Sequence, residues 1–112
     1  SLHQKSYADA TILLKDLIKT NPLDGRSMLL LADALGKQDQ GAEAVLILER
    51  ASRLEDYRKQ ALRLLINDAL SKEKFDNAYQ KLSLLQDEGF DPEIAETMRQ
   101  LESILASQSL SE

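Results

Sequence analysis

The side chains that could support catalysis are few. The single histidine, His3, stands near the start of the chain, and no cysteine is present. A nucleophile–base pair or a transition-metal site needs a second histidine or a cysteine, so neither is expected. No glycine-rich phosphate loop is present. Carboxylates occur in close pairs, which are typical of charged helix surfaces and caps: Glu43 with Glu49, Asp87 with Glu88, and Asp91 with Glu93. The sequence therefore predicts a non-catalytic protein without a metal or other cofactor.

The composition is that of a globular, helix-forming chain with an acidic balance. Of 112 residues, 43% are hydrophobic and 29% are charged, and the net charge is −5. This balance opposes nucleic-acid binding, which usually needs a basic stripe. No apolar run approaches the ~18 residues that span a bilayer, and Ser1–Gln4 does not resemble a signal peptide. The lack of cysteine fits both the cytoplasm and the periplasm, so the compartment stays open.

The elements that must position any binding residues repeat along the chain. Three segments have an alanine followed at +4 and +7 by apolar residues, an offset that places all three on one helical face. Equivalent positions recur every 34 residues: Ala10, Ala44 and Ala78; Leu14, Leu48 and Leu82; Leu17, Ala51 and Leu85. The small residue at the head of each face lets a neighbouring helix approach closely.

Further amphipathic stretches lie between these segments, which predicts an all-α fold of about six helices. The stretches 26–36 and 58–70 keep the same spacing, with Met28 and Leu62 34 residues apart. Capping residues and breakers mark the ends, including Asp24, Asp56 and Asp91 as N-caps and Pro92 in the first turn. The last residues, 107–112, are expected to fray. The expected helices span about 4–20, 25–36, 41–54, 57–71, 75–88 and 92–107.

The period and the helix–turn–helix layout resemble the tetratricopeptide repeat, whose pattern is W-x-x-L-G-x-x-Y followed by A-x-x-x-F-x-x-A and a proline. Asp56 stands where the proline is usual, Ile66 where a small residue is usual, and Ala69 where tyrosine is usual. The matching residues are Met28, Leu31, Ala32, Leu35, Ala44, Leu48 and Ala51 in one repeat, and Leu62, Leu65, Ala78, Leu82 and Leu85 in the next.

The resemblance implies a right-handed superhelix of antiparallel helix pairs, formed by one domain over residues 1–112. It would hold the second half of a repeat (4–24), two repeats (25–58 and 59–92) and a capping helix (92–107). A half-repeat leaves an apolar face uncovered, so the chain is expected to be a piece of a longer protein. The alternative is a plain helical bundle with accidental spacing.

In the family that the chain resembles, the first helix of each repeat lines a concave binding groove. Arg63 and Asn67 are one helical turn apart and could together hold a carboxylate or a peptide backbone. Asp33 would repel a carboxylate, so a clamp for a chaperone C-terminus is not expected. An ordinary solvated helix face is the alternative. The groove positions implied are Arg26, Leu29, Asp33, Lys37, Gln60, Arg63, Asn67, Ser71, Arg99 and Ser103.

The first predicted helix offers a second candidate surface, because no preceding helix covers it. Its apolar side, within Lys5–Thr20, is expected to pack on a neighbouring repeat, a second copy or another protein. Leu13, Leu14, Leu17 and Ile18 would form this patch, with Leu2 and Tyr7 beside it.

These features predict a scaffold or adaptor that binds a protein or peptide through its groove. The second reading is a structural spacer in a longer solenoid that self-associates or packs through the uncovered helix. RNA recognition is a third reading, opposed by the acidic balance and the lack of groove aromatics. A regulatory domain attached to an enzyme is the fourth.

Overall fold

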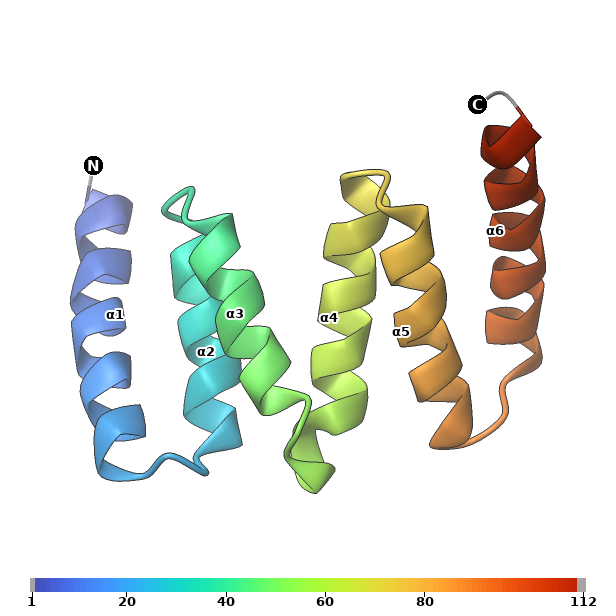
Figure 1. The fold of residues 1–112 in the computed structure, drawn as a ribbon. Helices are drawn as coiled ribbons and strands as arrows, with labels where there is room; N and C mark the ends of the chain where they lie inside the picture. The colour runs from blue at the N-terminus through green and yellow to red at the C-terminus, as the bar shows by residue number, and fades with distance from the viewer. Residues whose placement is uncertain (1, 111–112) are drawn as a thin grey trace. The chain divides into compact units, whose positions relative to one another are not determined.

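In the computed structural model, which describes residues 2–110, the chain forms six α-helices and one short 3₁₀-helix (Figure 1). No strand occurs in this part of the chain, so the predicted all-α class is confirmed. The elements are α1 (Leu2–Thr20), α2 (Gly25–Gly36), α3 (Gly41–Ala51), η1 (Glu55–Tyr57), α4 (Arg58–Ser71), α5 (Phe75–Asp87) and α6 (Pro92–Leu110).

The predicted helix ends differ from the structure mainly at two places. Helix α3 stops at Ala51, because Ser52 caps it and donates its hydroxyl hydrogen bond to the Glu49 carbonyl at 2.7 Å. Asp56 lies inside η1, so its prediction as an N-cap was wrong. Helix α6 continues to Leu110 rather than 107, because no glycine or proline interrupts this segment. The predicted fraying was therefore wrong for residues 107–110, and residues 111–112 lie outside the described part.

The other two predicted aspartate caps are confirmed. Asp24 precedes α2 and accepts hydrogen bonds from the Ser27 backbone N–H at 3.0 Å and the Ser27 hydroxyl at 2.6 Å. Both hydrogen bonds lower the pKa of Asp24 below its usual value, and the bond from the Ser27 hydroxyl has the larger effect. Asp91 accepts from the Glu93 backbone N–H at 2.8 Å, and Pro92 is the first residue of α6. Both carboxylates thus satisfy donors that a helix start leaves unpaired.

The first compact unit, residues 1–61, contains α1, α2, α3 and η1. Helix α2 packs against both α1 and α3, and Met28, Leu31 and Leu35 of α2 are almost completely buried. Gly25 starts α2 directly beneath Tyr57 of η1, where an added Cβ would lie 2.3 Å from the ring. The absence of a side chain at Gly25 is therefore what lets η1 pack on α2.

The second compact unit, residues 62–112, is built from most of α4 together with α5 and α6. Its core draws on all three helices: Leu62, Ile66 and Ala69 from α4, Ala78, Leu82 and Leu85 from α5, and Leu101 from α6. Tyr79 of α5 donates a hydrogen bond from its hydroxyl to Glu102 of α6 at 2.6 Å, which raises the pKa of Tyr79. Helix α6 is thus fixed by both apolar and polar contacts.

Burial repeats with the 34-residue period in the two units. Every apolar position of the proposed pattern on α2 and α3 is buried, and so is its equivalent on α4 and α5. The pairs are Met28 and Leu62, Leu31 and Leu65, Ala32 and Ile66, Leu35 and Ala69, Ala44 and Ala78, Leu48 and Leu82, and Ala51 and Leu85. Two stretches of different sequence therefore bury the same face at the same register.

The turns inside the two helix pairs repeat as well. Asp39, between α2 and α3, has φ 58°, and Glu73, between α4 and α5, has φ 55°. The next backbone N–H donates back to the helix in both cases, from Gln40 to the Leu35 carbonyl at 2.9 Å and from Lys74 to the Ala69 carbonyl at 2.8 Å. This is the Schellman arrangement, which favours glycine at the left-handed residue. Each turn therefore has a non-glycine residue at a positive φ, where the Cβ atom causes steric strain.

Relieving this strain should stabilise the protein. Glu73→Gly should raise the free energy of unfolding in urea by about 0.5–1 kcal/mol, because glycine adopts positive φ without a steric cost. Glu73→Ala is the matched control, since it removes the same side chain but keeps the Cβ, and it should give no gain. Equal effects of the two substitutions would contradict a left-handed residue 73.

Candidate functional site

Arg63 and Asn67, the pair predicted to hold a ligand, lie on α4 and line one pocket of the second unit. The pocket has a volume of about 310 Å³. Buried side chains of α4 and α5 supply apolar lining, while α6 supplies residues of its first turns. Its lining residues are Arg63, Ile66, Asn67, Leu82, Leu85, Asp91, Glu93, Ile94 and Thr97. The guanidinium and the amide, both on exposed residues, thus flank a partly apolar hollow.

The loop that forms one side of this pocket is tied to α5. The Gln86 side chain makes two hydrogen bonds with the backbone of Asp91, accepting from its N–H at 2.7 Å and donating to its carbonyl at 3.1 Å. These bonds fix the start of α6 beside α5. The hydrogen bonds to Gln86 therefore hold Asp91 at the pocket, and Glu93 is held there by the first turn of α6.

The charges of the pocket favour a neutral or basic ligand. Arg63 is a cation, and Asp91 and Glu93 are acids, so the lining carries more negative than positive charge. A carboxylate bound by Arg63 would lie near both acids and be repelled by them. Peptide carbonyl groups can accept from a guanidinium and an amide without that repulsion. The acids beside Arg63 were missed as pocket residues from the sequence, which did not show that the start of α6 faces α4.

The predicted groove residues of the first unit lie on α2, except for Lys37, which caps the C-terminal end of α2, and Gln60, which lies on α4. Arg26, Asp33, Lys37 and Gln60 are exposed, and Leu29 is half-buried. Lys37 donates to Asp33 at 2.9 Å, which raises the pKa of Lys37, and its ammonium lies 5.7 Å from the centre of the Tyr7 ring. Exposed pairs of this kind contribute little to stability. Asp33 and Lys37 nevertheless partly neutralise each other.

Arg99, the predicted groove residue on α6, does not line the pocket around Arg63. It is exposed, and its guanidinium binds Glu96 one turn earlier through Nε at 3.0 Å and through a second nitrogen. The pair raises the pKa of Arg99 and lowers that of Glu96. The structure thus brings Arg63 and Asn67 together, while Arg99 is engaged within its own helix. Ser71 and Ser103, the remaining predicted positions, are exposed on α4 and α6.

The outer side of α1 is the second predicted surface. Leu13 and Leu17 are 61% and 44% exposed, and Leu14 and Tyr7 are half-buried, but Ile18 is only 5% exposed. The prediction of Ile18 as a patch residue was therefore wrong, because its side chain is covered within the first unit. The patch prediction also missed Ile12, which is 71% exposed. The side chain of Leu2 lies outside what is described.

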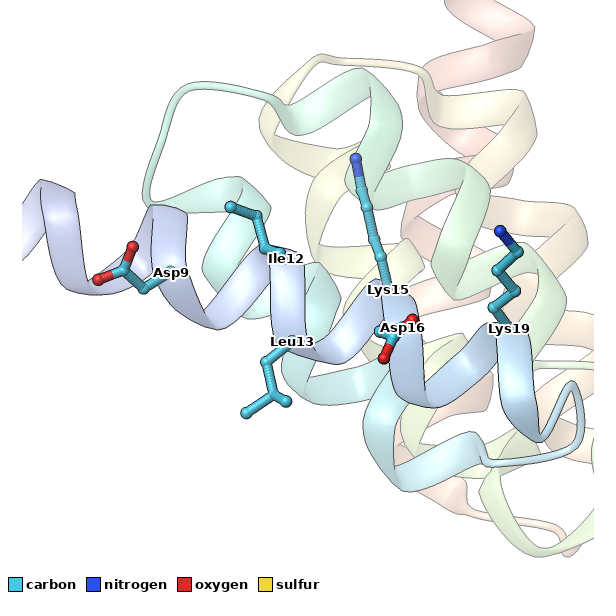
Figure 2. A pocket seen from close by; sticks show the side chains of 6 residues that line it. All are labelled: Asp9, Ile12, Leu13, Lys15, Asp16 and Lys19. Carbon is cyan, nitrogen blue, oxygen red and sulfur yellow. The ribbon is translucent and has the colours of Figure 1, made fainter.

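A hollow of about 510 Å³ extends along this helix (Figure 2). It is lined by Asp9, Ile12, Leu13, Lys15, Asp16 and Lys19. Ile12, Lys15 and Lys19 project to one side of α1, whereas Leu13 points to the other (Figure 2). The hollow therefore combines two exposed aliphatic side chains with two acids and two bases.

The repeat positions of α1 differ from those of α3 and α5 in burial. Ala10 and Leu14 are half-buried and Leu17 is exposed, whereas the equivalent residues of α3 and α5 are at most 7% exposed. Each of those two helices is preceded by a helix of its own pair, α2 or α4.

Metal-binding groups do not gather in residues 2–110. No set of three or more His, Cys, Asp or Glu side chains in this range lies close enough to hold a metal ion. His3 is exposed at the start of α1. Over the same residues, no helix is both long and apolar enough to span a membrane.

The sequence matches no model of a known protein family, and no curated protein matches it significantly. Function is therefore inferred from the residues and geometry of the chain itself.

Proposed function

We propose that the chain is a tetratricopeptide-like repeat module that binds a protein or peptide and has no catalytic activity of its own. The observation that carries this proposal is the repetition of buried positions and left-handed turns at 34-residue spacing. Helix pairs of this kind stack into superhelices whose surfaces bind other proteins.

The pocket around Arg63 and Asn67 is the proposed contact point for an extended peptide. One apolar side chain of the ligand would enter the hollow above Ile66, Leu82 and Leu85. The Arg63 guanidinium and the Asn67 amide would donate to its backbone carbonyls. Asp91 and Glu93 would favour a neutral or basic sequence over an acidic one.

This site can be tested by selecting peptide ligands for the immobilised chain from a random ten-residue display library. Selected peptides should lose binding about tenfold or more to the variant Arg63→Ala with Asn67→Ala, because both donors are removed. The matched control Lys59→Ala with Asn77→Ala changes two exposed residues outside this pocket and should bind normally.

Selected peptides that bind both variants equally would contradict the assignment of this pocket. Urea unfolding of each variant separates lost binding from lost folding, and all four side chains are exposed, so stability should change by less than about 0.5 kcal/mol.

A structural role is the second candidate function, and the exposure of Leu13 and Leu17 is the observation that favours it. The chain would serve as a spacer that packs or self-associates through the uncovered face of α1. Burying two leucine side chains would contribute roughly 2–4 kcal/mol before the entropy of association is subtracted.

Sedimentation velocity over a hundredfold range of concentration tests this role. A self-associating chain should show a faster boundary at high concentration, and Leu13→Asp with Leu17→Asp should abolish it. Leu46→Asp with Leu84→Asp is the control, because these leucines are 66% and 51% exposed on α3 and α5. A chain that stays monomeric throughout, or loss of association in both variants, would contradict a specific role for α1.

A further inference from the structure

A second pocket, distinct from the one around Arg63, lies wholly within the first unit. Its volume is about 390 Å³, within the range of small ligand sites. The lining comes from α1, the loop after it, α2 and α3: Lys15, Ile18, Lys19, Pro22, Leu31, Ile47 and Arg50. None of these residues was predicted as part of the binding groove, although Ile18 was predicted as part of the apolar patch on α1.

The apolar part of this lining is well fixed. Ile18 and Leu31 are 5% and 1% exposed, so they belong to the core of the unit as well as to the pocket. Pro22 is held in a turn where the Asn21 N–H donates to the Leu17 carbonyl at 2.9 Å and the Asp24 N–H donates to the Asn21 carbonyl at 3.1 Å. An aliphatic side chain could therefore enter a preformed hollow with little rearrangement.

The charged residues of the lining are all cations. Lys15 is paired with Glu43 at 2.9 Å, which partly neutralises it. Lys19 and Arg50 form no ion pair within residues 2–110. The pocket around Arg63, by contrast, contains two acids. On a chain of net charge −5, this is a local excess of positive charge beside an apolar hollow.

The two lysines are directed to the same side of α1. Lys15 and Lys19 are one turn apart, and their side chains extend in the same direction (Figure 2). Arg50 belongs to the last turn of α3 and lines the same pocket as both lysines. A ligand in the hollow would thus meet cations from two helices.

We propose that this pocket binds an acidic peptide segment of another protein. An aliphatic side chain of the segment occupies the hollow formed by Ile18, Leu31 and Ile47. Flanking carboxylates pair with the Lys19 ammonium and the Arg50 guanidinium, whose planar donors suit a carboxylate. The charge complementarity between an all-cationic lining and an acidic ligand selects this partner. The site goes beyond the proposed peptide groove, because it lies in the other unit and favours ligands of opposite charge.

Lys19 and Arg50 also lie in the last turns of α1 and α3, where a cation stabilises the helix dipole. Substitution of Lys19 and Arg50 can therefore lower the stability of the fold as well as the affinity for the peptide. Neutral replacements keep this effect small, and a stability measurement on each variant separates the two effects.

Isothermal titration calorimetry with a synthetic peptide tests the proposal. The probe is acetyl-Glu-Glu-Asp-Leu-Leu-Glu-Asp-Glu-amide, titrated into the whole chain at low salt. Lys19→Gln with Arg50→Gln should weaken binding about tenfold or more, because two close ion pairs are lost. Lys5→Gln with Lys59→Gln removes the same charge from exposed positions outside the pocket and should weaken binding less than about threefold.

The hollow is tested separately by replacing both leucines of the peptide with serine, which should weaken binding about tenfold or more. Equal affinity of the leucine and serine peptides would overturn the proposal, since charge alone would then explain binding. Equal losses in the two protein variants would also overturn it. A failure of the peptide to bind would overturn the proposal as well. This includes the case in which the unliganded chain self-associates through Lys19 and Arg50.

Discussion

Close contact between alanine-led helix faces is the constraint on which the rest of the structure depends. Ala44, Ala51 and Ala78 are at most 7% exposed, and each begins or ends a face completed by leucine. A larger side chain at these positions would push the neighbouring helix away and lose the dispersion contacts behind it. The same buried positions recur after 34 residues, and the left-handed residues Asp39 and Glu73 lie in the turns that follow α2 and α4.

The burial of these repeated positions determines which side chains remain exposed for binding. Helices that repeat their buried face also repeat their exposed faces, so charged residues at those positions can vary without disturbing the core. One pocket has Arg63 beside two acids, and the other has Lys15, Lys19 and Arg50 beside aliphatic residues. The two pockets differ in charge balance and lie in different units.

The sequence predicted the helices well and the surfaces only in part. Apolar spacing and breakers such as Pro92 act locally, so they located six helices to within a few residues. Arg63 and Asn67 were found because they lie one turn apart on one helix. The pocket with Lys19 and Arg50 was missed because its members come from three helices and a loop, and their proximity depends on packing. Ile18 was misplaced because sequence periodicity does not tell which side of a helix is covered.

Duplicating one period is the most direct test of the central claim that residues 25–58 form a stacking repeat. A chain with a second copy of residues 25–58 inserted after Arg58 should fold, keep its helix content per residue, and unfold at a higher urea concentration than the parent, because stacked repeats gain stability with number. A duplicate of residues 31–58, which breaks the 34-residue register, should instead be destabilised. If both insertions lowered the urea midpoint to the same extent, the 34-residue unit would not be a repeat in the structural sense.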